Sequence, residues 1–307
     1  MRQPLPGRPP ARPATRDRWS GVSPPPCAGV SPTAPSAVSS EPGPVAGSWR
    51  PLPYRPPFRK RRVRGLLGLP AGRVELVTRR FRERADLGLR GAPPGAVWAN
   101  NRSGIRYAAA VSKALRSEVE AGVTRGPFRD PPFPDFRVSP LGARLKESGA
   151  ARIILDLSAQ AGSAVNDFIN PDECSISYAS LDELAALIYE RGGAGTYLFK
   201  TDVRAAFKLI PVRPDQHRAL GFHWDGDFYY QTALPFGCRA SPRLFNDFAE
   251  LLRDATRVAT GNPGVLNYLD DFFGVELSPP GVGASTNDFF SWLSANGSAC
   301  RCSPLSA

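Results

Sequence analysis

The chain has 307 residues, of which 42% are hydrophobic, enough to bury the core of one or two domains. Its formal net charge of +11 is uneven, because residues 1–94 carry 18 Lys and Arg against 5 Asp and Glu, while the remainder carries 21 against 23. The chain has only two histidines, which argues against a histidine-based hydrolase. Its five cysteines include no C-x-x-C pair, which argues against a zinc or disulfide scaffold. We find no secretory leader and no apolar run of membrane-spanning length, which argues against a secreted or membrane protein.

The first predicted segment is a basic, proline-rich tail. Residues 1–60 hold 16 of the 33 prolines, and this composition buries too little apolar surface to offset the entropy of ordering. We therefore predict disorder over residues 1–95, with nucleic acid as the first candidate partner for the positive charge. The run "FRKRRVR" (58–64) is either a nuclear-import or RNA-contacting patch or a solvated linker. We expect an intracellular protein, cytoplasmic or nuclear, with no membrane partner.

From residue 96 the pattern predicts a globular α+β domain. "RYAAAVSKALRSEVEAGV" (106–123) has the apolar spacing of a helix that ends near Gly122, and the proline-punctuated stretch 126–142 predicts an extended loop. "ARIILDLS" (151–158) predicts a strand. "SLDELAALIYERGG" (180–193) predicts a helix that opens with a capping box of Ser180 and Glu183 and stops at Gly192.

A second run of elements follows. "TYLFKTDV" (196–203) predicts a strand, and "RALGFHWDGDFYYQTAL" (218–234) predicts a hairpin around Asp225-Gly226, a preferred turn pair. "ASPRLFNDFAELLRDATRVATG" (240–261) predicts a helix with Ser241 as N-cap and Pro242 at its first position. "VLNYLDDFFGV" (265–275) predicts two short strands joined by Asp270-Asp271.

The Asp270-Asp271 pair is an unusual turn. A two-residue hairpin turn needs positive φ and favours Asn-Gly or Asp-Gly, and neighbouring carboxylates also repel each other. On this stretch alone two interpretations stay open: a solvated surface turn, or a site at which local rules yield to function.

A third carboxylate supports the second interpretation. Asp202 ends one predicted strand, and if that strand lies beside the Asp-Asp hairpin, the three carboxylates converge at one edge of the sheet. Oxygen ligands with no histidine or thiol nearby suit Mg²⁺ or Mn²⁺. Two such ions about 3.5–4 Å apart serve in-line phosphoryl transfer, and they would cancel the repulsion between the carboxylates.

Four ordered blocks extend this pattern to a known family. "FKTDVRAAFKLIPV", "LPFGCRASPRLF" and "YLDD" resemble motifs A, B and C of retroelement reverse transcriptases, and "RIILDLS" resembles the fingers motif that precedes them. "YLDD" alone is weak evidence, whereas the ordered set, over roughly residues 100–275, is strong. The blocks are most similar to those of retrotransposons that integrate with a tyrosine recombinase, and next to those of long-terminal-repeat elements.

The resemblance implies fingers and palm of a right-hand polymerase over residues 96–275, with an antiparallel palm sheet and helices on one face. It implies template-directed addition of deoxynucleotides to a primer 3′-OH, with two Mg²⁺ ions. The implied partners are an RNA template, a DNA or RNA primer and deoxynucleoside triphosphates. Asp202 and Asp270 would be the main metal ligands, with Asp271 and the carbonyl of Val203 beside them, and Tyr268 would lie near the primer end.

The resemblance also implies a nucleotide site. Arg152 would hold the triphosphate, with Lys146 as a second candidate. Phe207 would block a ribose 2′-OH and so select deoxynucleotides. The full implied set of nucleotide-binding residues is Lys146, Arg152, Ala206, Phe207, Phe236 and Gly237.

The chain departs from the family after motif C. No lysine follows Lys208, so the family's motif-D general acid has no counterpart, and residues 276–307 match only the start of that region. We therefore expect a truncated enzyme with intact motifs, a partly disordered end and impaired extension. One alternative is an inactive remnant that binds RNA through its basic tail. A less favoured one is an RNA-dependent RNA polymerase, against which the aromatic Phe207 argues.

Overall fold

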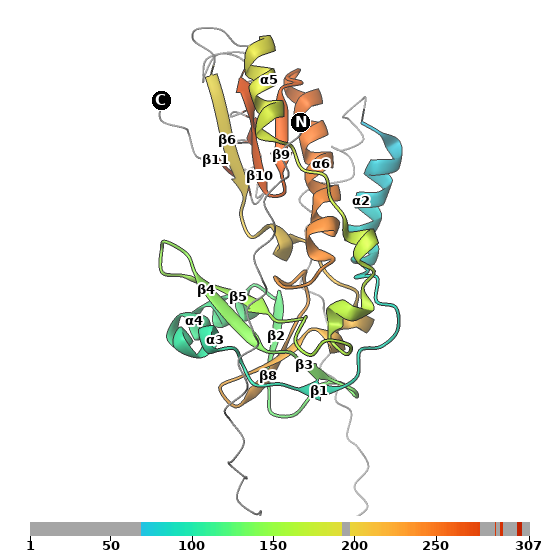
Figure 1. The fold of residues 1–307 in the computed structure, drawn as a ribbon, viewed down its shortest axis with the longest axis vertical. Helices are drawn as coiled ribbons and strands as arrows, with labels where there is room; N and C mark the ends of the chain where they lie inside the picture. The colour runs from blue at the N-terminus through green and yellow to red at the C-terminus, as the bar shows by residue number, and fades with distance from the viewer. Residues whose placement is uncertain (1–68, 192–196, 277–285, 287–288, 291–299, 303–307) are drawn as a thin grey trace, which may run out of the picture. The chain divides into compact units, whose positions relative to one another are not determined.

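The computed structural model describes residues 69–191, 197–276, 286, 289–290 and 300–302 (Figure 1). Helices and strands both occur throughout this part of the chain, which confirms the predicted mixture of α and β structure. The helices are α2 (Ala71–Glu83), α3 (Arg102–Arg106), α4 (Ala108–Glu120), α5 (Leu181–Arg191) and α6 (Ser241–Thr260), with 3₁₀ turns η1 (Val165–Phe168), η2 (Pro171–Cys174), η3 (Ala206–Leu209) and η4 (Pro214–Ala219). None of the described helices is long and apolar enough to cross a membrane.

The strands form two sheets and a separate hairpin. The five-stranded sheet has the order β1-β3-β7-β8-β2, and the four-stranded sheet has the order β11-β6-β10-β9. The hairpin consists of β4 and β5. The strands are β1 (Ala96–Val97), β2 (Thr124–Phe128), β3 (Arg137–Val138), β4 (Leu141–Leu145), β5 (Ala151–Leu155), β6 (Tyr197–Val203), β7 (Gly221–Trp224), β8 (Asp227–Gln231), β9 (Val265–Tyr268), β10 (Asp271–Glu276) and β11 (Cys300–Cys302).

Around the hairpin, α4 packs against β5 and β2 while α3 packs against β4. Val111 and Leu115, one helical turn apart, are the fully buried side chains of α4. The stretch 126–142, for which the sequence predicted an extended loop, instead contributes the end of β2, all of β3 and the start of β4. Pro127 lies within β2, and the other prolines of the stretch lie in the connections between these short strands.

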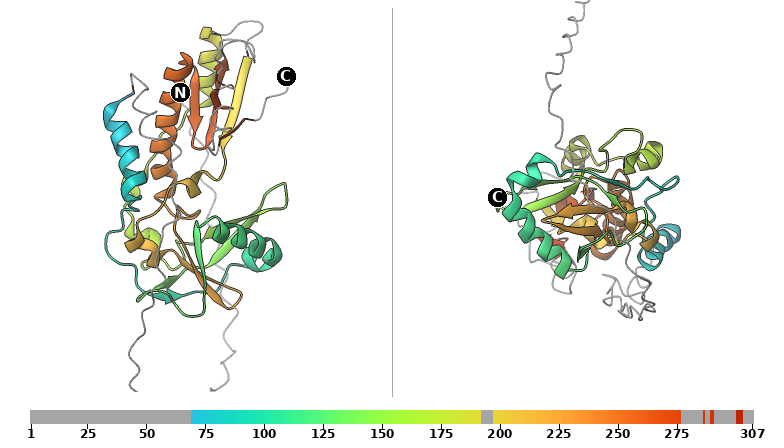
Figure 2. Two further views of the ribbon diagram at one scale, coloured as in Figure 1. Left: turned by 180° about the vertical axis from the view of Figure 1, so that it is seen from behind. Right: turned by 90° about the horizontal axis from the view of Figure 1, so that it is seen from below.

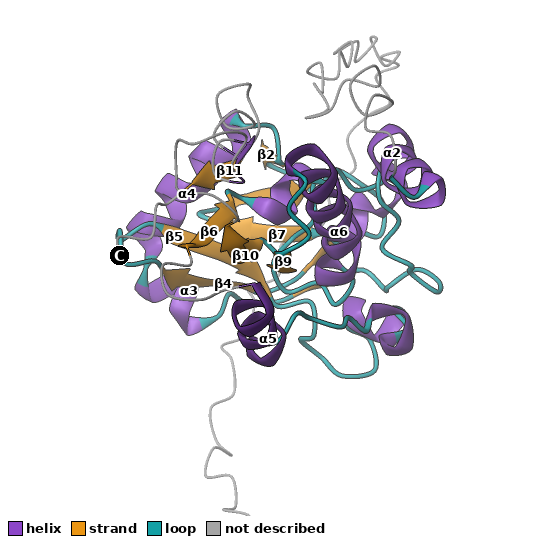
Figure 3. Ribbon diagram, turned by 90° about the horizontal axis from the view of Figure 1, so that it is seen from above, coloured by secondary structure: helices purple, strands orange, loops and turns teal. Residues whose placement is uncertain are grey.

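In the four-stranded sheet, burial alternates along most of β6 and along β9. Phe199, Thr201 and Val203 of β6 are buried on the same face as Phe272 of β10, because Phe272 is the register partner of Thr201. On this face Phe290 packs against Phe199 and Phe272. Helix α6 contacts β9 and α5 contacts β10, and the two helices lie on opposite faces of the sheet (Figures 1, 2 and 3). The predicted arrangement, with helices on one face, therefore differs from the structure.

The predicted N-terminal cap is present in α5 but not in α6. The capping box of α5 is confirmed, because the Glu183 amide donates to Ser180 Oγ at 3.1 Å and the Ser180 amide donates to the Glu183 carboxylate at 3.0 Å. In α6 the N-cap is Ala240 rather than Ser241, and no side chain caps the helix. Ser241 is fully buried and its hydroxyl donates to the Pro235 carbonyl at 2.8 Å, so it fastens the preceding loop instead.

The structure differs from the predicted disorder over residues 69–95. Helix α2 packs against α6, with Val77 buried and the rings of Phe81 and Phe248 in edge contact at 5.7 Å. Arg73 pairs with Asp254 at 2.7 Å, so charge as well as apolar contact joins the two helices. Residues 1–68, which include the basic run 58–64, lie outside the described residues, as do Gly192 and most of 277–307.

Candidate active site

Two of the predicted carboxylates face each other across neighbouring strands. Asp202 of β6 and Asp271 of β10 are register partners in an antiparallel pair. The Val203 amide donates to the Asp270 carbonyl at 2.9 Å, just outside this pair. Asp202 and Asp271 are therefore a non-hydrogen-bonded pair, the type in which opposing side chains come closest.

The turn itself lies one residue earlier than predicted. Asp271 pairs with Tyr268, so the two turn residues are Leu269 and Asp270, and Asp271 is the first residue of β10. Leu269 has φ +52°, in the left-handed region that a leucine rarely adopts. The turn holds Asp270 beside the Asp202–Asp271 pair by placing an unfavourable residue in a strained position.

Negative charge accumulates at this end of the sheet. Burial raises the pKa of the Asp270 carboxyl, and the charges of Asp271 and Asp202 raise that pKa further, while the Arg152 guanidinium opposes the shift. Lys200 Nζ lies 3.4 Å from an Asp271 oxygen and is the one cation that the structure pairs with these carboxylates within the described part. The charge of Asp270 is thus not fully compensated by the protein.

This donor set suits a hard divalent cation in its chemistry, since it offers carboxylate oxygens in a region of unbalanced negative charge. Across the described residues, however, no three His, Cys, Asp or Glu side chains stand close enough together to hold an ion as they are. The residues thus fit Mg²⁺ or Mn²⁺ by chemical type, but as they stand they do not form a complete set of ligands.

Three of the predicted nucleotide residues, from three separate segments, are in contact. The Arg152 guanidinium of β5 lies 4.6 Å from the centre of the Phe236 ring, in a cation–π contact. The ring of Phe236 lies 4.9 Å from that of Phe207, which is half-buried on η3 and also contacts Phe245 of α6. The influence of Arg152 on the pKa of Asp270 connects this cluster to the carboxylates.

Ala206 and Gly237 support the cluster through the backbone. Ala206 is buried at the start of η3, directly after Ala205, whose φ of +55° turns the chain away from β6. Gly237 has φ +98°, and a Cβ at this position would lie 1.8 Å from the Leu155 carbonyl oxygen of β5. The Leu155 amide donates to the Phe236 carbonyl at 3.0 Å. Glycine is therefore required where this loop meets β5.

Lys146 does not join the cluster in the described contacts. It is exposed at the tip of the β4–β5 hairpin, where its amide donates to the Ala150 carbonyl at 2.9 Å. Instead Arg144 is the register partner of Arg152, and both side chains are exposed. The sequence gives no signal for Arg144, because only the hairpin register shows which residue faces Arg152.

A second missed residue lies next to Tyr268. The rings of Tyr178 and Tyr268 are stacked with centres 4.4 Å apart. Tyr178 is 40% exposed and Tyr268 is 48% exposed. Tyr268 lies on the same face of the sheet as its partner Asp271. The pair is thus an exposed aromatic platform beside the carboxylates, and the pattern of residues 175–179 contained no signal for it.

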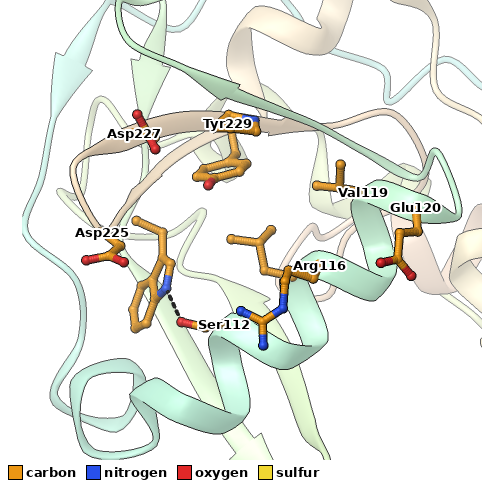
Figure 4. Close-up of a pocket in the computed structure, with 10 residues that line it drawn as sticks. Ser112, Arg116, Val119, Glu120, Asp225, Asp227 and Tyr229 are labelled. Carbon is orange, nitrogen blue, oxygen red and sulfur yellow. Dashed lines mark hydrogen bonds between the residues drawn. The ribbon is translucent and has the colours of Figure 1, made fainter.

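A pocket of about 260 Å³ lies elsewhere, between α4 and the β7–β8 hairpin (Figure 4). Leu115, Trp224 and Tyr229 form part of its wall, and Trp224 Nε1 donates to Ser112 Oγ at 2.9 Å. Arg116 and Asp227 line it as well. None of the predicted site residues borders this pocket, so it is separate from the candidate active site.

The fold resembles that of a solved viral polymerase. A selenomethionine-labelled mutant of prototype foamy virus protease-reverse transcriptase aligns with 79% of this chain and 32% of its own, at 18% identity and a TM-score of 0.50. The native enzyme aligns with 62% of this chain and 22% of its own, at 22% identity and a TM-score of 0.43. The foamy viral enzyme in complex with an RNA/DNA hybrid aligns with 69% of this chain and 25% of its own, at 20% identity and a TM-score of 0.48.

The chain spans less than a third of the length of these viral chains. No family model and no curated protein sequence matches it. At such low identity the likeness concerns the fold: the described part of the chain has a reverse transcriptase-like fold.

Proposed function

We propose that the chain carries the fingers and palm of a reverse transcriptase, most similar in its motifs to the retrotransposon enzymes that accompany a tyrosine recombinase. The reaction is RNA-templated addition of a deoxynucleotide to a primer 3′-OH. One observation carries the proposal: Asp202 is paired in register with Asp271 and lies beside Asp270, at the end of the sheet that Arg152 reaches electrostatically. The foamy virus enzyme, whose fold is similar, is itself a reverse transcriptase.

Asp202 and Asp270 would hold Mg²⁺ or Mn²⁺, with Asp271 and the Val203 carbonyl beside them. Such ions, when bound, activate the attacking hydroxyl and stabilise the charge on the leaving pyrophosphate. The contribution of the protein is to keep the carboxylates close together. The strained turn at Leu269 supports that role, because it presents Asp270 next to the paired Asp202 and Asp271.

The triphosphate would lie against the β4–β5 hairpin. Arg144 and Arg152 are like charges directly opposite each other, an arrangement that destabilises a hairpin in the absence of an anion. A triphosphate between the two guanidinium groups would relieve this repulsion and accept several charge-assisted hydrogen bonds. Because Arg152 also rests on the Phe236 ring, its position is defined before the substrate binds.

Phe207 would select the sugar. Its ring is held by Phe236 on one side and Phe245 on the other, so it cannot move aside easily for a 2′-OH. We expect Phe207→Val to increase the use of ribonucleotides at least tenfold relative to deoxynucleotides, since a smaller side chain leaves room for the hydroxyl, on the order of 1.4 kcal/mol of discrimination. Single-nucleotide addition with matched deoxy- and ribonucleotides measures this ratio, and an unchanged ratio contradicts the assignment.

The primer end would contact the tyrosine platform. Tyr268 and Tyr178 together present aromatic surface beside the carboxylates, and stacking on aromatic side chains contributes about 1–3 kcal/mol per base in single-stranded complexes. A planar, stacked pair is harder to displace than a single exposed ring. The platform therefore supports a role in holding the terminal primer nucleotide.

The test is addition of one nucleotide to a labelled primer on an RNA template by the whole chain. We expect addition that requires Mg²⁺ or Mn²⁺ and a deoxynucleotide, and that is lost in Asp202→Asn. Salt-sensitive RNA binding without any addition would support the RNA-binding alternative, because the 18 Lys and Arg of residues 1–94 suffice for it. Equal use of ribonucleotides would support an RNA-dependent RNA polymerase.

A further inference from the structure

A single buried amide connects two segments that are distant in sequence. Asn166, on η1, is 5% exposed. Its side-chain nitrogen donates to Ser158 Oγ at 2.8 Å and to the Gly237 carbonyl at 2.9 Å. Its side-chain oxygen accepts from the Arg239 amide at 2.9 Å. The side chain therefore bonds both ends of the Gly237–Arg239 loop segment.

The backbone of Asn166 strengthens the same connection. Its carbonyl accepts from the Arg239 guanidinium at 2.7 Å, and its amide donates to the Leu157 carbonyl at 2.9 Å. The Arg239 guanidinium also donates to the Ile169 carbonyl at 3.0 Å. Residues 157–169 and the loop that begins at Phe236 are thus joined mainly through Asn166, with one further hydrogen bond from Arg239 to Ile169.

The loop comes very close to β5 at Gly237. Gly237 has φ +98° and approaches β5 so closely that no side chain fits. The result of this approach is that Phe236 lies under the Arg152 guanidinium and against Phe207. Moving the loop away from β5 would break the hydrogen bond between the Leu155 amide and the Phe236 carbonyl and separate the Arg152–Phe236 pair.

We infer that Asn166 is a positioning residue for the proposed nucleotide pocket: it holds the 236–239 loop against β5 so that Phe236 supports Arg152 and Phe207. Only the identity of the ligand rests on the proposed function. Asn166 acts on the pocket through the Gly237 carbonyl and the Arg239 amide, rather than through the side chains of Arg152, Phe207 or Phe236. The role requires both a donor and an acceptor, which the amide side chain supplies at once.

The chain offers a matched control. Asn262 is 1% exposed, its nitrogen donates to the Val275 carbonyl at 2.8 Å and to Thr286 Oγ1 at 3.0 Å, and its oxygen accepts from the Gly264 amide at 2.9 Å. It fastens the end of α6 to β10, away from Phe236. Truncation of either asparagine removes three side-chain hydrogen bonds, so a difference in where exchange accelerates reports the position of the residue rather than a general loss of stability.

The experiment is hydrogen exchange resolved to single amides on the whole chain, with Asn166→Ala and Asn262→Ala. In Asn166→Ala we expect the Arg239 and Leu155 amides to exchange at least about tenfold faster than in the parent chain, and the Gly264 amide to exchange at the parent rate. In Asn262→Ala we expect the Gly264 amide to exchange faster, and the Arg239 and Leu155 amides to exchange at the parent rate. Asn166→Asp keeps the volume and the acceptor for Arg239 but loses the donor to Gly237, and serves if the alanine variant fails to fold. We expect faster exchange at Leu155 in this variant as well.

A second measurement connects the loop to the ligand. With Mg²⁺ and a deoxynucleoside triphosphate, the dissociation constant should rise about tenfold in Asn166→Ala and stay within about twofold in Asn262→Ala. Unchanged exchange at Leu155 and Arg239 in the Asn166 variants would overturn the inference. Faster exchange with unchanged nucleotide affinity would overturn its connection to the pocket. If the parent chain binds no nucleotide, the proposed function fails, and the exchange rates still decide the role of Asn166 in the loop.

Discussion

Two hairpins of this chain have the same length of turn and opposite turn chemistry. In the β7–β8 hairpin, Trp224 pairs with Asp227, and the two turn residues Asp225 and Gly226 have φ of +51° and +85°. Both residues tolerate these values, so the turn follows local rules. Its sequence predicts it correctly.

In the β9–β10 hairpin, Tyr268 pairs with Asp271, and the turn residues are Leu269 and Asp270. A leucine at φ +52° costs roughly 1–2 kcal/mol relative to glycine. The next residue is a carboxylate whose pKa is raised by burial and by two neighbouring negative charges. This hairpin lowers its own stability at both turn positions.

The two hairpins also differ in how well the charges around them are compensated. Beside β8, the buried Lys208 ammonium is paired with Glu118 and Gln231, so charge is compensated where the fold needs stability. Beside the β9–β10 turn, the carboxylates of Asp202 and Asp271 oppose each other. The β9–β10 turn thus lowers stability in three ways, whereas the β7–β8 turn has residues suited to its backbone, and this difference makes the β9–β10 turn the region in which to look for chemistry.

Neutralising one carboxylate in each turn tests the difference between the two hairpins most directly. We expect Asp270→Asn to lower nucleotide addition by about 10³-fold or more, on the order of 4 kcal/mol, because the metal-dependent step loses a charged ligand. The free energy of unfolding should stay the same or rise, since Asp270 is a partly buried charge among like charges. Addition kinetics and urea unfolding measure the two effects.

Asp225→Asn is the matched control, because it removes one turn carboxylate from the other hairpin and asparagine tolerates positive φ. It should leave addition within about twofold and stability within about 0.5 kcal/mol of the parent chain. Equal loss of activity in both variants would mean that the β9–β10 turn has no special role.

The parts of this fold that the sequence predicted are those that local rules determine. The Ser180–Glu183 capping box, the Asp225-Gly226 turn and the strand that carries Asp202 are each decided within a few residues. Helix α2 also had a local signal, with Val74, Val77 and Phe81 at helical spacing, but averaging composition over residues 1–95 concealed it.

The parts that the sequence could not predict depend on register and on distant contacts. Arg144 faces Arg152 only because the hairpin joins them in that register. Asn166 lies 71 residues from its acceptor Gly237, and a polar residue in a loop gives no sign of such a partner. The turn at Leu269 was placed one residue late because turn propensity favours aspartate over leucine, and here the observed backbone does not follow propensity.

A second prediction concerns acid stability, which we expect to reside on the β8 side. Burial lowers the pKa of His217 to about 4, with its Nε2 3.0 Å from the Val212 carbonyl and its ring beside Tyr230 of β8. The unfolded chain binds a proton near pH 6.5, whereas the folded chain resists it until about pH 4. The contribution is therefore complete above pH 6.5 and is lost as pH falls toward 4, on the order of 3 kcal/mol in total.

In His217→Gln, the amide can still donate to the Val212 carbonyl, but no group titrates at this position. We expect the free energy of unfolding to change less between pH 7 and pH 4.5 than in the parent chain, by on the order of 2–3 kcal/mol. Urea unfolding at both pH values measures this difference. A parent and variant with the same dependence on pH would show that the acid sensitivity lies elsewhere.

A third prediction tests the rule-following turn directly. Gly226→Ala should lower the free energy of unfolding by about 1 kcal/mol, because a Cβ at φ +85° is strained even though no atom lies within 4 Å of it. Nucleotide addition should stay within about twofold, since Gly226 lies in the hairpin beside the separate pocket rather than beside the carboxylates. Thermal or urea unfolding with addition kinetics on the same sample distinguishes the two effects. A loss of addition larger than the loss of stability would connect this hairpin to the chemistry.

The smallest expected change in stability comes from the converse substitution. Leu269→Gly relieves a left-handed leucine, a gain of about 1 kcal/mol, but it also removes the contacts of a half-buried side chain and loosens the unfolded chain. These terms offset each other, so we expect the free energy of unfolding to change by less than about 0.5 kcal/mol. Nucleotide addition should nevertheless fall several-fold, about 3- to 10-fold, because a flexible turn holds Asp270 less firmly beside Asp202 and Asp271. Unfolding and nucleotide addition, both measured on this variant, test whether the strained turn supports the reaction. A variant that is clearly more stable and fully active would show that the strain at Leu269 has no role in the site.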